Sequence, residues 1–205
     1  MARPPFSTPL LLLLLLLCIA PLLLLTSASS DQQRPSQQQL AAATSFIRAS
    51  CRTTRYPALC VSSLSAYAPA IRTSPRQLAH AALSVSLTRA KSTSSFVAKL
   101  GTTRGLRARE AGAIRDCVEN MGDSVDEIKR SLGEMGRVGG GTFQWRMSNV
   151  QTWVSAALTN ENTCVDGFQG VDGSTKSAVK ARIQNVAQVT SNALALVNCL
   201  AAPAP

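Results

Sequence analysis

Aromatic residues, acidic residues and histidine are all scarce in this sequence, and the shortages of aromatics and of histidine each exclude a class of function. Phe, Trp and Tyr make up 4% of the 205 residues, so few side chains can stack on nucleic-acid bases. There is also no dense basic run to bind the phosphates. The one histidine, His80, cannot form a metal site if the cysteines are paired in disulfides. We therefore expect no nucleic-acid partner and no bound metal.

Catalytic motifs are also missing from the chain. It contains no Gly-x-Ser-x-Gly elbow, no Cys-x-x-Cys pair and no phosphate-binding loop. Most of its acids are predicted to lie on the exposed face of one helix, rather than in a cleft that could shift their pKa values. We expect that the protein is not an enzyme and uses no cofactor.

The first 30 residues have the pattern of a secretory signal peptide. Arg3 gives a weakly basic start, an apolar run from Leu10 to Leu25 is broken only by Pro21, and small residues follow at 26–30. A membrane anchor is the alternative, but the run is about 16 residues long and a spanning helix needs about 20. We expect residues 1–30 to be removed and the protein to be exported without a membrane anchor.

Cysteine usage changes once that segment is removed. Cys18 leaves with it, and five cysteines remain. An exported chain with five cysteines should form two disulfides and keep one thiol. Spacing in the sequence does not by itself fix which cysteines pair.

Positive charge dominates the rest of the chain. The formal net charge is +10, and the predicted signal peptide takes away only Arg3. A basic exported protein is held by polyanions or acidic surfaces. A solvated basic surface with no specific partner explains the charge equally well.

A small stapled unit is predicted before the main body. Residues 31–43, rich in Gln, Ser and Pro, are expected to be a disordered leader. Over 44–70, Pro57 separates two short helices, of which the first carries Cys51 and the second Cys60. This pattern predicts an α-hairpin. A disulfide between these cysteines closes a short loop and contributes about 2.7 kcal/mol in the chain-entropy model. Isolated short helices need such a staple.

Four long amphipathic helices make up the main body, residues 74–201. Apolar residues recur every three or four positions, without any strand period, in four segments: Pro75–Leu100 after a Ser74 cap, Leu106–Met135, Trp145–Phe168 and Ser174–Ala201. Short connections between helices of about 25 residues predict an all-α, up-down-up-down four-helix bundle. Residues 202–205 are expected to be a frayed tail.

The second disulfide is predicted from the helix order. Cys117 lies early in the second long helix and Cys164 late in the third, both on apolar stripes, so antiparallel packing can bring them together. That longer loop contributes about 4 kcal/mol in the same model. Cys199 is then the free thiol, expected to be buried near the end of the fourth helix. The acids of the second helix are expected to pair with arginines of neighbouring helices.

Two cysteine motifs point to a known family. Asp-Cys-Val-Glu-Asn around Cys117 and Thr-Cys-Val-Asp-Gly-Phe at 163–168, combined with the signal peptide and the Cys51–Cys60 hairpin, resemble the plant invertase/pectin methylesterase inhibitor family. The resemblance runs from about Thr44 to Leu200. It implies a four-helix bundle with an N-terminal α-hairpin, two disulfides and often a fifth, free cysteine.

The resemblance also implies a choice between two targets. One branch of the family binds pectin methylesterase 1:1 and non-covalently in the cell wall and covers its pectin cleft. The other inserts a Pro-Lys-Phe motif, placed between the second and third bundle helices, into acid invertase. Here that connection reads Gly-Arg-Val-Gly-Gly-Gly-Thr-Phe-Gln-Trp and has no such motif. The third helix looks like the methylesterase branch and like inhibitor-like pro-regions of the enzyme.

We therefore predict a free-standing inhibitor of pectin methylesterase in the plant apoplast, since the chain stops at Pro205 with no catalytic domain after the bundle. An inhibitor of acid invertase and a structural wall protein with no enzyme target are the alternatives. A weak association with acidic pectin is also expected from the positive charge.

The contact face is predicted on the polar sides of the second and third long helices, because a bundle can cover a polar cleft without supplying any residue for chemistry. The residues are Glu119, Asn120, Asp123, Gln151, Ser155, Thr159, Thr163 and Asp166. For Thr163 and Asp166, which flank Cys164, bracing of the helix end is an equally good interpretation.

Overall fold

Helices make up nearly all of the computed structural model, which describes residues 35–137, 141–171 and 173–202. The helices are α2 (Gln37–Cys51), α3 (Pro57–Leu64), the 3₁₀ helix η2 (Ser65–Tyr67), α4 (Ala68–Ile71), α5 (Pro75–Gly101), α6 (Ala108–Gly136), α7 (Phe143–Gly167) and α8 (Ser174–Ala201). No strand occurs in these ranges, and the predicted all-α class is confirmed. The predicted signal peptide and the last three residues of the tail lie outside the described residues.

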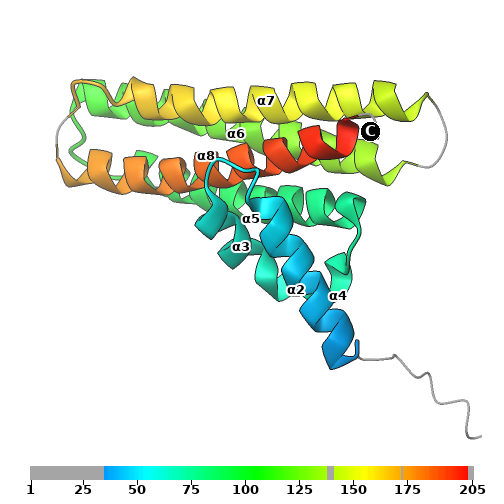
Figure 1. Cartoon of the computed structure of the whole chain (residues 1–205). Coiled ribbons are helices and arrows are strands. Elements are labelled where there is room, and N and C mark those ends of the chain that lie inside the picture. Colours follow the sequence, from blue (N-terminus) through cyan, green and yellow to red (C-terminus); the bar gives the residue numbers. More distant parts are fainter. Residues whose placement is uncertain (1–34, 138–140, 172, 203–205) are drawn as a thin grey trace, which may run out of the picture. The chain divides into compact units, whose positions relative to one another are not determined.

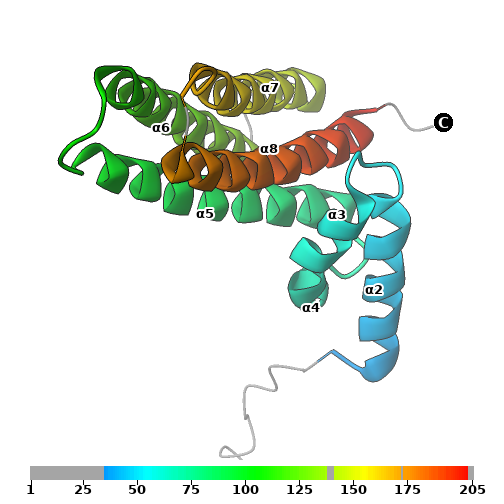
Figure 2. The same cartoon turned by 90° about the vertical axis from the view of Figure 1, so that its left-hand side faces the viewer.

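The four long helices form the predicted antiparallel bundle (Figures 1 and 2). In chain order, α5 packs on α6, α6 on α7, α7 on α8, and α8 returns to α5. Each helix turns its apolar stripe inward: Leu83, Ile114, Val154 and Ile183, one from each helix, have no exposed surface. The bundle is up-down-up-down, as its short connections predict.

Local signals set several helix ends. Ser74 Oγ accepts a hydrogen bond from the Gln77 backbone N–H at 3.3 Å, and Pro75 occupies the first helical position of α5. Thr142 caps α7 in the same way, accepting from the Trp145 backbone N–H at 3.2 Å. The cap explains why α7 begins at Phe143, two residues before the predicted start.

The expectation of a disordered leader over 31–43 is wrong from Gln37 onward. Helix α2 begins there, and a capping box precedes it: Ser36 Oγ accepts from the Gln39 backbone N–H at 3.2 Å, while Gln39 Oε1 accepts from the Ser36 N–H at 3.0 Å. Gln and Ala are good helix formers, and Ala43 is buried, so this segment gains from both propensity and packing. Residues 31–34 lie outside the described part.

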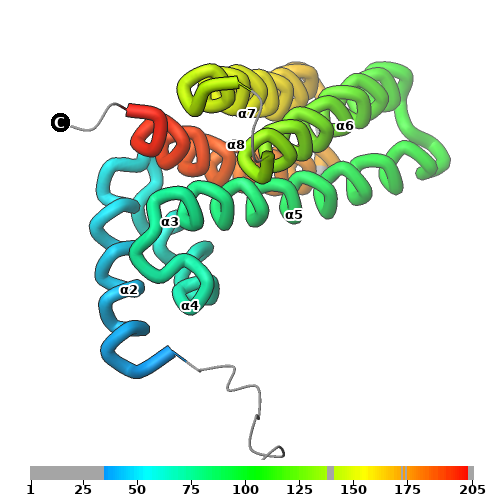
Figure 3. Tube along the Cα trace, turned by 90° about the vertical axis from the view of Figure 1, so that its right-hand side faces the viewer, coloured from blue at the N-terminus to red at the C-terminus, as the bar shows by residue number. Residues whose placement is uncertain are grey.

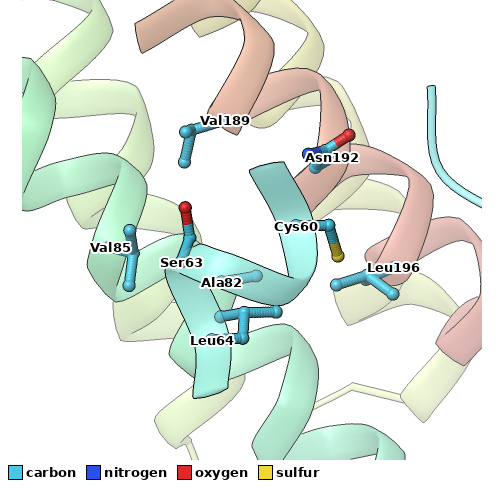
Figure 4. Close-up of a pocket in the computed structure, with 8 residues that line it drawn as sticks. All are labelled: Cys60, Ser63, Leu64, Ala82, Val85, Val189, Asn192 and Leu196. Atoms are coloured by element: carbon cyan, nitrogen blue, oxygen red, sulfur yellow. The ribbon is translucent and has the colours of Figure 1, made fainter. Parts of the chain in front are cut away.

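The stapled hairpin packs against the bundle chiefly through α3, which contacts α5 and α8, with further contacts of α4 on α5 and of α2 on α8 (Figure 3). Side chains of the three helices converge on a cavity of about 10 Å³, too small for more than one water (Figure 4). Its two polar members already have partners: Ser63 Oγ accepts from Arg89 Nη2 at 3.1 Å, and Asn192 binds the Tyr56 backbone. We interpret this cavity as a packing defect of the docked hairpin and not as a ligand site.

Both predicted disulfides are present. Cys51 is bonded to Cys60 and Cys117 to Cys164, with Cα–Cα distances of 5.6 and 4.4 Å. Cys199 is free as predicted, but it is exposed and the expected burial is wrong. Val197 is the inward residue of that turn, and two further residues rotate a side chain by about 200°.

The acids of α6 do not follow the predicted pattern of pairing with neighbouring helices. Asp126, Glu127 and Glu134 form ion pairs within α6 or just beyond its end, with Lys129, Arg130 and Arg137, each three residues later. Such i,i+3 partners are available without any tertiary contact.

The described helices include none that is long and apolar enough to cross a bilayer.

Candidate functional site

The outer side of α6 carries acids that are free for an external partner. Glu119 and Asp123 are exposed, and neither has a basic partner among the described residues. Asn120 is half-buried, and its Nδ2 donates to the Asp116 backbone oxygen at 2.8 Å. The three predicted residues of this helix therefore lie at the surface, two with free carboxylates and one fixed to its own helix.

The Cys117–Cys164 disulfide fixes α6 and α7 at the same level as these residues. Asn120 follows Cys117 by one turn, and Thr163 precedes Cys164 directly. The two helices are antiparallel, pack side by side along their length and are covalently joined here (Figure 1). We call the surface formed by the exposed residues of α6 and α7 the α6–α7 face.

Three of the predicted residues of α7 present hydroxyl groups on this face. Ser155, Thr159 and Thr163 are exposed at four-residue intervals. Thr159 Oγ1 donates to the Ser155 backbone oxygen at 3.0 Å, and Thr163 Oγ1 donates to that of Thr159 at 2.9 Å. The threonine protons are used within the helix, so these two hydroxyl oxygens are left as acceptors for a partner.

Gln151 belongs to a different surface. Its Nε2 donates to Asn198 Oδ1 on α8 at 2.9 Å, so its side chain bridges α7 and α8. Four residues overshoot one helical turn by about 40°, and a row that starts at Gln151 rotates away from α8 by the time it reaches Thr163. The structure does not bring Gln151 together with Glu119 and Asp123.

Asp166 lies on the same exposed side of α7 as Thr159. The backbone N–H of Phe168 caps the helix on the oxygens of Val165 and Asp166, whereas the Asp166 carboxylate has no hydrogen bond within the described chain. The side chain therefore braces nothing visible at this helix end. A surface role fits it better than a capping role.

Trp145 is a surface residue that the sequence prediction did not assign to the face. It is 56% exposed, and Phe143 nearby is 45% exposed. Trp145, Thr152, Thr159 and Asp166 are spaced seven residues apart, or about two turns, and all are exposed. The exposure of Trp145 could have been predicted from this spacing, because it places Trp145 outside the apolar stripe of α7.

The Trp145 ring is held against the backbone of the α6–α7 connection. A Cβ at Gly141 would lie 2.8 Å from Trp145 Cε3, and Gly141 has a φ of +74°. Both the close approach and the left-handed conformation require glycine. The exposed aromatic ring is therefore supported from one side rather than freely rotating.

A carboxylate in the centre of the bundle was also missed. Glu161 of α7 is fully buried, and its Oε1 accepts from Ser124 Oγ of α6 at 2.7 Å and from Thr190 Oγ1 of α8 at 2.9 Å. The Thr190 hydroxyl is in turn 2.6 Å from Ser86 Oγ of α5. Because Thr190 uses its proton on Glu161, Ser86 must be the donor in that last bond. One polar network thus joins all four long helices.

Burial raises the pKa of Glu161 from 4.5 to about 7, against the two hydroxyl hydrogen bonds, which lower it. Its Oε2 is buried with no partner in the described structure. The sequence held a signal for this residue, since Val154, Ala157, Glu161 and Cys164 continue one inward row at steps of three and four. Glu161 is sealed from solvent, so it belongs to the core and not to the face.

The site therefore has the composition of a recognition surface. It offers free carboxylates, hydroxyl oxygens and an exposed, supported tryptophan. Among the described residues no group of three or more His, Cys, Asp or Glu side chains is placed to hold a metal ion. Such a surface can contribute charge, hydrogen bonds and one aromatic anchor to a protein interface.

The sequence is similar to one protein family and to several of its named members. The family model described as plant invertase/pectin methylesterase inhibitor matches residues 45–196. A carrot (Daucus carota) protein named 21 kDa protein is 52% identical over 165 residues, which are 78% of this chain and 86% of that one. Pectinesterase inhibitors 11 and 9 of Arabidopsis thaliana are 50% and 53% identical, covering 78% and 75% of this chain and 82% and 79% of theirs.

The fold agrees with solved structures. A crystal structure of a mutant form of a pectin methylesterase inhibitor from Arabidopsis superposes with a TM-score of 0.62 at 20% identity, covering 77% of this chain and 96% of that one. At this identity the likeness concerns the fold. From the family model and the relatives at about 50% identity, the chain belongs to the plant invertase/pectin methylesterase inhibitor family.

Proposed function

We propose that this protein is an exported inhibitor of pectin methylesterase that binds the enzyme 1:1 and non-covalently and blocks its pectin-binding cleft. The observation that carries the proposal is the identity of about half to two proteins named pectinesterase inhibitors, over three quarters of this chain. The likeness covers the hairpin and all four bundle helices rather than one motif.

The α6–α7 face supplies the contact. Glu119, Asp123 and Asp166 provide charge, Ser155, Thr159 and Thr163 provide oxygen atoms, and Trp145 provides an anchor. An interface of ordinary size buries about 800 Å² on each partner, and a few residues, with tryptophan over-represented, carry most of its energy. Inhibition of this kind needs shape and charge alone, so the protein performs no chemistry of its own.

The cell wall is the proposed location, because the target acts on wall pectin and the first 30 residues have the pattern of a signal peptide. The positive charge of the chain supports a second, weaker association with acidic pectin.

Inhibition of acid invertase is the alternative within the family. It is less well supported, because the α6–α7 connection lacks Pro-Lys-Phe and the named Arabidopsis relatives are pectinesterase inhibitors. A structural role with no enzyme target has no specific observation in its favour.

Titration of the purified protein against both enzymes separates these functions. We expect methylesterase activity to fall to zero as the ratio of inhibitor to enzyme approaches one, and invertase activity to stay unchanged at micromolar inhibitor. Sub-micromolar inhibition of invertase would replace the proposal by the alternative. If neither enzyme responds, a role as an inhibitor of these two enzymes is excluded.

A further inference from the structure

A groove between α7, α8 and the α2–α3 connection contains polar groups that the α6–α7 face does not use. It has a volume of about 280 Å³, and its polar lining consists of Arg55, Tyr56, Asn162, Gln184, Gln188 and Ser191. In Figure 1 α7 and α8 run side by side, and the connection after α2 crosses beside α8. Small-molecule sites span about 300 to 1,000 Å³, so this groove is at the small end and suits a single unit of a longer chain.

One wall of the groove is held rigidly in place. Asn192, buried in α8, accepts a hydrogen bond from the Tyr56 backbone N–H at 3.0 Å and donates one to the Tyr56 backbone oxygen at 2.9 Å. The Arg55 guanidinium lies 5.8 Å from the centre of the Tyr56 ring. The backbone at Tyr56 is thus fixed at the edge of the groove, which lowers the entropic cost of binding there, while the exposed Arg55 side chain lies beside the Tyr56 ring.

The charge around the groove has one sign. No Asp or Glu occurs between Asp31 and Glu110 or after Asp172, so the hairpin and α8 contain no acids. Arg55 accordingly forms no ion pair in the described structure, and Lys180 lies one turn before Gln184 on α8. Glu161 directly precedes Asn162 on α7, but it is fully buried and bonded to Ser124 and Thr190 in the bundle, so it is not part of the lining. The nearest exposed acid along α7 is Asp166, one turn beyond Asn162 and also outside the lining. A positive groove of this kind attracts anions.

The lining also fits the chemistry of a sugar acid. Amide and hydroxyl groups both donate and accept, as sugar hydroxyls require. Arginine binds a carboxylate through two parallel hydrogen bonds. The Tyr56 side chain combines an apolar ring with a polar tip, and can cover the C–H side of a sugar ring. Each group on a uronic acid therefore has a suitable partner in the groove.

We propose that this groove binds a uronate unit of an acidic polysaccharide, with Arg55 on the carboxylate and Gln184 and Gln188 on the hydroxyls. Binding of a uronate follows from the groove alone. Its assignment to galacturonate in de-esterified pectin rests on the proposed function, because hydrolysis of pectin methyl esters leaves such carboxylates. The inhibitor would then be retained where the enzyme has already acted, with the α6–α7 face free to bind it.

Calorimetry on the purified protein, with no enzyme present, tests the groove. The probes are a fully de-esterified oligogalacturonate and its fully methyl-esterified counterpart. We expect the acidic form to bind at least tenfold more tightly, with an affinity that falls as salt rises. Arg55→Ala should weaken it tenfold or more, whereas Arg48→Ala, which removes an exposed arginine of α2 outside the lining, should not. Gln188→Ala is a second variant, and circular dichroism checks the fold of each.

Several results would overturn the proposal. These are no binding of the acidic probe, equal binding of the two probes, equal losses in Arg55→Ala and Arg48→Ala, or equally tight binding of polyglutamate, which has carboxylates but no sugar. Methylesterase titration of Arg55→Ala separates this outcome from a failure of the proposed function. We expect that variant to inhibit like the parent whether or not it binds the oligosaccharide.

Discussion

The Ser124 hydroxyl of α6 donates a hydrogen bond of 2.7 Å to the carboxylate of Glu161 on α7, in the buried centre of the bundle. Thr190 of α8 donates to the same oxygen, and Ser86 of α5 to Thr190. A carboxylate at this position costs free energy when it is charged, because among the described residues only hydroxyl groups and no cation compensate it. The network therefore makes the stability of the bundle depend on the protonation of one residue.

The first prediction is that the protein is more stable in acid than at neutral pH. Glu161 has a pKa of about 7 when folded and an ordinary value of 4.5 when unfolded, so the folded state binds more protons between these values. As far as Glu161 is concerned, the free energy of unfolding is greatest below pH 4.5. It falls as the pH rises toward 7, by about 3 kcal/mol at 1.36 kcal/mol per pKa unit. Melting temperatures measured from pH 4 to 8 check this.

Glu161→Gln is the variant for this prediction, since a neutral amide resembles the protonated acid. Its melting temperature should lose most of the pH dependence between 4.5 and 7. Asp126→Asn is the matched control: this acid is exposed, its pKa is lowered by the hydrogen bond and charge of Lys129, and its loss should leave the neutral-range slope in place. A full slope in Glu161→Gln would assign the effect to other groups.

The four long helices and their arrangement as a bundle could be predicted from the sequence, because the spacing of the apolar residues indicates both. The segment Ser174–Ala201 was predicted with the bounds that the structure has. The disulfides followed from the same pattern, since Cys117 and Cys164 lie on inward stripes of antiparallel neighbours.

Other features depend on contacts that a linear pattern does not contain. The Ser36–Gln39 capping box sits in a Gln-rich segment whose composition suggests disorder. Glu161 stands between two asparagines; its place in the inward row of α7 hints at burial, but its hydrogen-bond partners Ser124 and Thr190 come from two other helices and cannot be read from the sequence of α7. Gln151 has the right spacing for the face, but its contact with Asn198 is set by the packing of α7 on α8.

The second prediction concerns the aromatic anchor of the α6–α7 face. Trp145→Ala should weaken methylesterase binding by about 2 kcal/mol, roughly 30-fold, because exposed tryptophans are frequent interface anchors. Its side chain is 56% exposed, so the melting temperature should hardly change. Tyr67→Ala is the control, since Tyr67 is 41% exposed on the hairpin. Equal inhibition by Trp145→Ala and the parent protein would place the contact elsewhere.

The third prediction concerns the polar residues of the same face. Alanine at Asp123, Thr159 or Asp166 should weaken inhibition without loss of helicity, since all three are exposed. Gln151→Ala should instead lower stability by about 1 kcal/mol, through the lost bond to Asn198, and leave inhibition intact. Enzyme titration and thermal melting on the same samples decide. If affinity falls only in step with stability across the series, these residues are structural.

The fourth prediction uses glycine to move Trp145 without removing it. Gly141→Ala places a Cβ 2.8 Å from the indole ring, so the ring must shift, and inhibition should weaken. Gly105→Ala is matched to it: φ is +82° there, but nothing lies within 4 Å of the new Cβ. Both variants carry backbone strain of about 1 kcal/mol or more. Tryptophan fluorescence should change in Gly141→Ala alone, and a similar change in both would contradict this account.

Calorimetric titration of pectin methylesterase with this protein, run with and without a methyl-esterified oligogalacturonide in the enzyme cleft, shows whether the inhibitor occupies that cleft. We expect a transition at one inhibitor per enzyme and an affinity that falls in proportion to occupancy of the cleft by the oligosaccharide. An affinity that the oligosaccharide leaves unchanged, or no binding heat at all, would contradict a protein that acts by covering the pectin-binding cleft.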